Sequence, residues 1–340
     1  MKLTNLKNNA LQKYNGLKIY FRKILIQFID FVTEKYFAGA RWFIVAREKM
    51  TDLRATNLDL ANFHLQNGNL NDAIFRLKLV DKFFTSGDSR AKFLLGWCYL
   101  IKQDFKNAQT YFEATKEPEA KDVIYFIKSE DLTQIPSNIL IQYYEFWADK
   151  IDEELSSSEN IILKRFLEIQ TPLLDSLKDD AKILELGCKT GVIGEKISAI
   201  MNKNYLLEAV EISQRMCRMA RNRNYVSRSF YAKVNCQNIE EYLKTVEGKF
   251  DYVIAYNSFN TNKNFAPLLK QLKKKMPKAQ IILCLKLSQG KDVDFDRSKF
   301  NFVYDTKFIE AEIESVGLKI STIENIQDDS SEEYYVVLCS

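Results

Sequence analysis

The sequence contains one histidine, His64, among 340 residues. A histidine-based catalytic triad or a histidine-rich metal centre is therefore nearly excluded. None of the six cysteines forms a Cys-x-x-Cys pair or any other metal-binding spacing, and most lie inside apolar runs. We interpret them as reduced, buried thiols of a cytoplasmic protein, and we expect no bound metal.

Long apolar runs are also missing. The most apolar early stretch, residues 24–29, has only six residues before Asp30, whereas a membrane-spanning helix needs about 20. No signal peptide is apparent. The net charge is +4, from 49 basic and 45 acidic residues. This balance gives no reason to expect a nucleic-acid partner.

Residues 1–50 are basic, with ten Lys or Arg against three acids. Apolar residues recur there at helical spacing, at Leu17, Tyr20, Phe21, Ile24, Leu25, Phe28 and Val32. Two interpretations stay open. The helix either packs its apolar face against the helices that follow, or it lies on an anionic membrane surface.

A repeat occupies residues 56–115. Ala73 and Ala108 are equivalent and 35 residues apart, which is typical of helix–turn–helix repeats. The second copy resembles the tetratricopeptide repeat, with its signature positions filled by Leu95, Gly96, Tyr99, Ala108 and Phe112. In the first copy His64 stands at the aromatic position, so we interpret it as a packing residue.

The stretch Lys182–Gly194, KILELGCKTGVIG, predicts a buried strand, a glycine turn and a helix. This is the opening of a doubly wound α/β domain, in which ligands bind at the carboxyl ends of the strands. A second apolar run, residues 206–213, ends near Glu211, about 20 residues after Gly191. Such folds place there the acid that binds a ribose diol.

Together, ELGCKTG, AVEISQRMCRMAR and KFDYVIAYNSF resemble the class I S-adenosylmethionine-dependent methyltransferases, over about 155 residues from Lys182 onward. The helix expected from Ser137, as its N-cap, to Leu155 is similar to one in bacterial predicted methyltransferases that carry N-terminal tetratricopeptide repeats. The resemblance implies a Rossmann-like, seven-stranded α/β domain whose last two strands, 318–324 and 334–339, are antiparallel. We place an all-α repeat domain at residues 1–135 and the methyltransferase domain at residues 136–340.

The resemblance also implies roles for individual residues. Glu185 would reach the methionine amino group of S-adenosylmethionine, above a loop of Gly187, Cys188 and Gly191. Glu211, followed by Ile212, would bind the ribose. Asn238 and Ile239 would contact the adenine, and Trp147 belongs to a helix that closes over the cofactor in relatives. The full set of expected cofactor contacts is Glu185, Gly187, Cys188, Gly191, Glu211, Ile212, Asn238, Ile239 and Trp147.

Tyr256, Asn257 and Ser258 follow the fourth predicted strand and would face the methyl acceptor. Asn257 does not stand in the Asn/Asp-Pro-Pro-aromatic motif of amine-methylating enzymes, and no catalytic base carries over from the family. Lys189 replaces a glycine of many relatives. A positive φ at that position costs a lysine about 1 kcal/mol, and its side chain would crowd the cofactor.

Two functions remain open. One is a methyltransferase whose repeat domain recruits a protein or peptide acceptor in a groove. The other is a scaffold that keeps the fold, has lost catalysis and acts through protein binding. Lys189, Asn238, Ile151 and the pair Tyr304-Asp305 depart from the family pattern and favour the scaffold. Glu185, Gly187, Gly191 and Glu211 favour the enzyme.

Overall fold

The computed structural model describes residues 21, 23–28, 52–84, 87–129, 131–227, 230–297, 299–328 and 331–340. Of the basic N-terminal helix that we predict, residues 21 and 23–28 are described and helical. Leu17, Tyr20 and Val32 lie outside the described residues. Within the described ranges, no helix has both the length and the apolar character needed to cross a bilayer.

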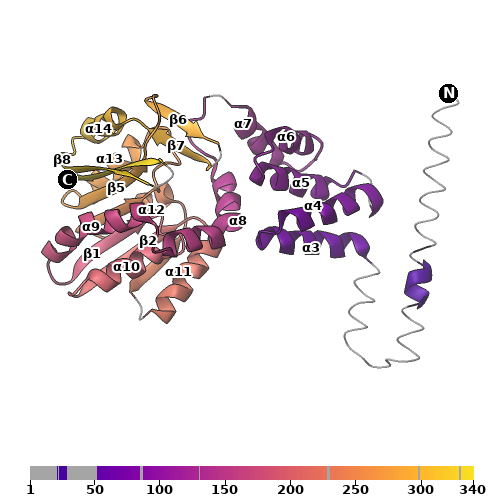
Figure 1. Cartoon of the computed structure of the whole chain (residues 1–340), viewed down its shortest axis with the longest axis horizontal. Helices are drawn as coiled ribbons and strands as arrows, with labels where there is room; N and C mark the ends of the chain where they lie inside the picture. The colour runs from indigo at the N-terminus through magenta and orange to yellow at the C-terminus, as the bar shows by residue number, and fades with distance from the viewer. Residues whose placement is uncertain are drawn as a thin grey trace. The chain divides into compact units, whose positions relative to one another are not determined.

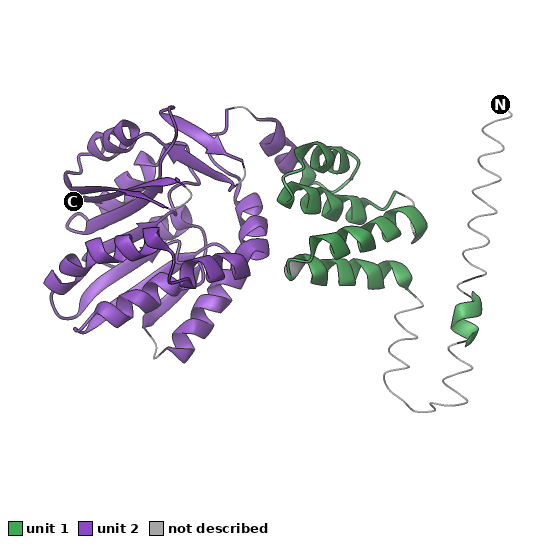
Figure 2. Cartoon of the chain, viewed as in Figure 1, with its two compact units in different colours: residues 1–120 green, residues 121–340 purple. Residues whose placement is uncertain are grey.

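The chain divides into two compact units, residues 1–120 and residues 121–340 (Figure 2). Residues 121–135, which the sequence analysis grouped with the helical domain, belong to the second unit.

The first unit consists of helix pairs. Its helices are α3 (Leu53–Gln66), α4 (Leu70–Leu79), α5 (Ser89–Ile101) and α6 (Phe105–Glu113), with a π-helical turn, η1 (Val80–Phe84), after α4. Asn69 and Asp104, 35 residues apart, are the N-caps of α4 and α6. The equivalent residues of the two copies therefore begin equivalent helices.

Small residues bring these helices together, as the repeat predicts. Ala73, Ala91 and Ala108 are fully buried. A Cβ atom on Gly96 would lie 2.8 Å from the Phe112 ring, so only glycine allows α5 and α6 this approach. His64 contacts the Phe63 ring edge-on at 5.8 Å, in keeping with a packing role.

The second unit is a three-layer α/β domain with helices on both faces of one sheet (Figure 1). The strands are β1 (Ala181–Leu186), β2 (Tyr205–Glu211), β3 (Tyr231–Cys236), β4 (Tyr252–Tyr256), β5 (Gln280–Lys286), β8 (Ile320–Gln327) and β9 (Glu333–Cys339). Their order is β3-β2-β1-β4-β5-β9-β8, and only β9 runs antiparallel to its neighbours. The predicted seven-stranded sheet with an antiparallel last pair is confirmed.

The helices of this unit are α7 (Ala120–Lys128), α8 (Ser137–Ser156), α9 (Ile161–Ser176), α10 (Val192–Ile200), α11 (Gln214–Val226), α12 (Ile239–Thr245), α13 (Ala266–Lys275) and α14 (Thr306–Ser315). Helices α8 to α11 contact one another in one layer, and α12 to α14 in the other. Parallel strands buried on both faces explain the nearly continuous apolar run of β1 and β4.

Two details differ from the prediction. Ser137 is the first residue of α8, and Pro136 is its N-cap, because the extended Pro136 carbonyl accepts hydrogen bonds from Ile139 and Leu140. A two-stranded sheet of β6 (Val293–Asp296) and β7 (Asn301–Tyr304) was not predicted. Four-residue strands leave too little alternation for a sequence signal.

Candidate functional site

A pocket lies at the carboxyl ends of β1, β2 and β4. Seven of the residues predicted to touch cofactor or acceptor line it. They are Gly187, Glu211, Ile212, Asn238, Ile239, Asn257 and Ser258. We call this the nucleoside pocket, because its walls combine a strand-end carboxylate with two isoleucines. Lys189, Gln134, Leu140 and Tyr144 also line it, and of these only Lys189 was noted from the sequence.

The loop after β1 has the strained backbone that its glycines predict. Gly187 and Gly191 have φ of +73° and +85°, and Lys189 has φ of +51°. A left-handed lysine is unfavourable by about 1 kcal/mol, so the surrounding contacts must impose it. One such contact is the hydrogen bond from the Lys189 N–H to the Glu211 carboxylate, at 2.9 Å.

Glu211 is 3% exposed and held from two sides. The N–H of Lys189 donates to Oε2 and the N–H of Ser213 to Oε1, both at 2.9 Å. Burial raises the pKa of Glu211, although these two donors and the Lys189 ammonium lower it. Each carboxylate oxygen keeps a lone pair, which suits a ligand that presents two hydroxyls.

Glu185 does not line the nucleoside pocket, and its Oε1 is buried without a hydrogen-bond partner among the described residues, so its contact with the cofactor stays a prediction. It is 1% exposed, and the Tyr231 hydroxyl donates to its Oε2 at 2.5 Å. Burial raises the pKa of this carboxyl to about 8, while the Tyr231 hydrogen bond lowers it. At neutral pH the side chain is therefore mostly an uncharged acid inside the domain.

Tyr231 explains the glycines of this region. Its ring lies so close to Gly191 and Gly194 that added Cβ atoms would be 3.3 Å and 2.4 Å from it. Gly191 and the fully buried Cys188 support this packing and do not line the nucleoside pocket. The loop contributes Gly187 and Lys189 to the pocket wall instead.

The start of α12 forms the side of the pocket that the sequence predicts to hold the adenine. Asn238 caps this helix, its Oδ1 accepting from the Glu240 N–H at 2.7 Å, and Ile239 follows it. Trp147 does not line the pocket, and its indole packs edge-on against Phe146. Helix α8 instead contributes Leu140 and Tyr144.

The end of β4 offers polar atoms without partners. Asn257 has φ of +49°, and Asn257 Oδ1 and Ser258 Oγ are buried and make no hydrogen bond in the described part of the chain. Buried polar atoms are normally satisfied, so orphans in a pocket wall indicate a polar ligand. Together with Glu211, Ile212 and Ile239, they form a wall that fits a nucleoside cofactor.

A second pocket, of about 1140 Å³, lies beside the first and shares Lys189 and Asn257 with it. Helix α8 contributes Glu154, the end of β4 contributes Tyr256, and the β8–β9 hairpin contributes Glu332 and Tyr334. We call it the acceptor-side pocket. The predicted acceptor-facing residues therefore divide, with Tyr256 on this side and Ser258 on the nucleoside side.

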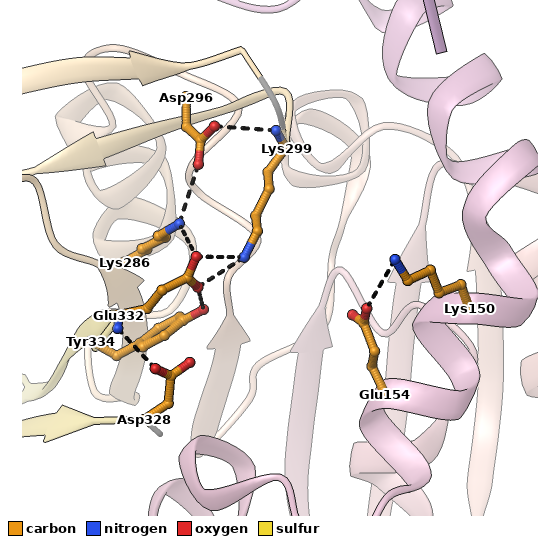
Figure 3. A network of polar contacts seen from close by, with 8 residues as sticks. All are labelled: Lys150, Glu154, Lys286, Asp296, Lys299, Asp328, Glu332 and Tyr334. Atoms are coloured by element: carbon orange, nitrogen blue, oxygen red, sulfur yellow. Dashed lines mark hydrogen bonds and ion pairs between the residues drawn. The ribbon is translucent and has the colours of Figure 1, made fainter. Parts of the chain in front are cut away.

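A charge network borders the acceptor-side pocket (Figure 3). Lys299 donates to both Glu332 oxygens at 2.8 Å, and Lys286 bridges Glu332 at 2.9 Å and Asp296 at 3.2 Å. Burial raises the pKa of Glu332, but the two lysines outweigh it and hold that pKa below its ordinary value. These ion pairs fix the hairpin and the β6–β7 sheet at the edge of the pocket. In the described ranges, no three His, Cys, Asp or Glu side chains form a metal-binding cluster.

Residues 183–279 match a family model described as "Methyltransferase domain". The second unit carries a methyltransferase domain. The match begins within β1, includes Glu211 and the end of β4, and supports the predicted methyltransferase. No curated protein sequence matches the chain.

Solved structures share the fold at low identity. The [4+2]-cyclase SpnF is 10% identical, with a TM-score of 0.50 over 62% of this chain and 98% of that one. Magnesium protoporphyrin IX methyltransferase from Synechocystis PCC 6803, with bound SAH, is 12% identical, with a TM-score of 0.48 over 60% and 99% of the two chains. A 1,6-didemethyltoxoflavin-N1-methyltransferase from Burkholderia thailandensis is 11% identical, with a TM-score of 0.45 over 60% and 85%.

Proposed function

We propose that the protein transfers a methyl group from S-adenosylmethionine, bound in the nucleoside pocket, to an acceptor that enters through the acceptor-side pocket. The observation that carries the proposal is the position of Glu211. A buried carboxylate ends β2, held by two backbone donors, with Ile212 and Ile239 beside it in the same pocket. That combination suits a ribose and an adjoining base.

The bound cofactor supplies a methyl group on a sulfonium, which is open to in-line displacement. The chain then needs to position two reactants and exclude water. Glu211 would hold the ribose, and Asn238 and Ile239 the adenine. Asn257 Oδ1 would accept a hydrogen bond from the remaining polar groups, and Ser258 Oγ would accept or donate one. Tyr256, 5% exposed at the floor of the acceptor-side pocket, would confine the acceptor.

The test is titration calorimetry of S-adenosylmethionine and S-adenosylhomocysteine into the wild type and Glu211→Ala. Losing a charged hydrogen-bond acceptor to the ribose costs about 1.5–3 kcal/mol, roughly a tenfold to hundredfold loss of affinity. Glu208→Ala is the matched control, since Glu208 lies on the same strand and accepts from Tyr242 away from the pocket. Equal affinities in all three proteins would remove the assignment of Glu211.

We further propose that the first unit recruits a protein or peptide acceptor. Its paired helices and 35-residue repeat support a tetratricopeptide-like groove, and Phe63 and Phe75 of this unit are each 58% exposed. The basic residues 1–50 remain a candidate membrane-surface contact. A cytoplasmic location is proposed from six cysteines that are all free thiols.

A scaffold without catalysis is the second candidate. The observation that favours it is Lys189, which lines both pockets and carries its ammonium 5.1 Å from the centre of the Tyr256 ring. If neither ligand binds at millimolar concentration, the scaffold is the better proposal, and the first unit becomes the functional part.

A further inference from the structure

Lys189 occupies the boundary between the two pockets. Only Lys189 and Asn257 line both. The lysine side chain turns toward β4, where its ammonium lies 5.1 Å from the centre of the Tyr256 ring. Its backbone N–H meanwhile donates to the Glu211 carboxylate at 2.9 Å. Lys189 thus contacts Glu211, the proposed ribose-binding residue, through its backbone and Tyr256 of the acceptor-side pocket through its side chain.

Burial lowers the pKa of the Lys189 ammonium, while Glu211 at the end of β2, Cys284 on β5, Glu154 on α8 and Glu185 on β1 raise it. Burial keeps Glu185 and Cys284 mostly protonated at neutral pH by raising their pKa values. Glu154 is 63% exposed and lies 3.9 Å from Lys150, so it is screened. Glu211 is therefore the main buried counter-charge, and Lys189 offsets it.

The cofactor's covalent structure then places its sulfur near this lysine. In an S-adenosyl compound the sulfur is bonded to the 5′ carbon of the ribose. If the ribose hydroxyls lie on Glu211, the sulfur lies only a few bonds from the carboxylate that accepts from the Lys189 N–H. S-adenosylmethionine carries a positive charge at that sulfur, and S-adenosylhomocysteine carries none.

We propose that Lys189 is a specificity-determining residue that makes the nucleoside pocket prefer the uncharged thioether, S-adenosylhomocysteine, over the sulfonium, S-adenosylmethionine. The inference rests on the proposed function. The two ligands share their adenosine and amino-acid parts, so contacts to those parts cancel in the ratio of their dissociation constants. What remains is the charge and the methyl group at sulfur. Repulsion between two unit charges at this range in a partly hydrated site is worth roughly a factor of ten.

The experiment measures that ratio by titration calorimetry at pH 7 in the wild type, Lys189→Met and Lys189→Arg. Methionine keeps the length of the side chain and the same backbone strain but removes the charge, whereas arginine keeps the charge. We expect the wild type and Lys189→Arg to favour S-adenosylhomocysteine by at least tenfold. Lys189→Met should lose about tenfold of that preference, chiefly by binding S-adenosylmethionine more tightly.

Lys299→Met is the control for overall charge, because Lys299 lines the acceptor-side pocket but pairs with Glu332. It should keep the wild-type ratio. An unchanged ratio in Lys189→Met, or an equal change in Lys299→Met, overturns the inference while leaving the proposed function in place. If the wild type and Lys189→Met are both folded, as judged by thermal unfolding, and neither binds either ligand, the inference and the proposed function are both overturned.

Discussion

At the scale of single residues, two acids predicted to do similar work have different roles. Glu211 ends β2 and Glu185 is the penultimate residue of β1, and the family resemblance implied a cofactor contact for each. Glu211 lines the nucleoside pocket, as expected. Glu185 is bound to Tyr231, which is 46 residues away in the sequence. A local pattern cannot reveal such a partner, although two glycines three residues apart, Gly191 and Gly194, hint at a large neighbour.

The burial of Glu185 predicts a pH effect on stability. Its pKa rises from 4.5 to about 8 on folding, so between these values the folded state binds more protons than the unfolded state. Stability from this group is therefore present below about pH 4.5 and is lost as pH rises toward 8. As the pH rises from about 4.5 to 8, we expect the free energy of unfolding of Glu185→Gln to increase relative to that of the wild type by up to about 1.4 kcal/mol per pH unit.

Urea unfolding of both proteins at pH 5, 6.5 and 8 measures this difference. A stability difference between the two proteins that is the same at all three pH values would contradict the prediction. Tyr231→Phe serves as a control, because it removes the hydrogen bond and leaves the titrating carboxyl.

At the scale of elements, the sequence predicted most of the second unit. Strong apolar runs and glycine or polar breaks located β1, β2, β4 and β5 to within a few residues, because strands buried on both faces carry a strong signal. The β6–β7 sheet was missed. Its strands, VDFD and NFVY, have four residues each, and the ion pairs Lys286–Asp296 and Lys299–Glu332 hold them beside the main sheet.

Helices α8, α10 and α11 depend on one arginine. Arg223 of α11 contacts Asp152 of α8 at 2.7 Å, Glu195 of α10 at 2.6 Å and the Thr190 carbonyl at 3.2 Å. It joins the three helices at a junction next to the glycine loop. Arg223→Ala leaves two acids and a carbonyl without this donor, and we expect it to lower the free energy of unfolding by about 1–3 kcal/mol.

Chemical denaturation measures that loss. Arg218→Ala, on an exposed position of the same helix, should change stability by less than about 0.5 kcal/mol. Equal effects of the two substitutions would mean that the Arg223 network contributes nothing beyond a surface arginine.

At the scale of the whole molecule, each unit has its own buried core. In the first, Leu77, Val80 and Leu95 are at most 1% exposed, and in the second the core follows β1, β4 and β5. Domains with separate cores generally fold independently. Both units were anticipated, but the sequence grouped residues 121–135 with the first, because α7 looks like one more helix of the repeat.

We therefore expect residues 121–340 alone to bind S-adenosylhomocysteine with the affinity of the full chain, measured by calorimetry. A second measurement incubates cell extract with S-adenosylmethionine that carries a tritiated methyl group, once with the full chain and once with residues 121–340. If the first unit recruits the acceptor, the label incorporated into extract proteins should be at least tenfold lower with the shortened protein. Equal labelling would place acceptor recognition in the second unit. Loss of cofactor binding would show that the units depend on each other.

The place of β9 in the sheet has a consequence for synthesis. Residues 333–339 form an inner strand between β5 and β8, so neither neighbour can complete its hydrogen bonding at this place in the sheet before β9 has been made. As the ribosome makes the chain, the helix pairs of the first unit emerge early and have only near neighbours to find. The β5 edge stays open until residue 339 has left the exit tunnel. Open strand edges promote aggregation. A stalled or prematurely terminated translation product would therefore carry a folded first unit joined to an incomplete sheet that is prone to aggregate.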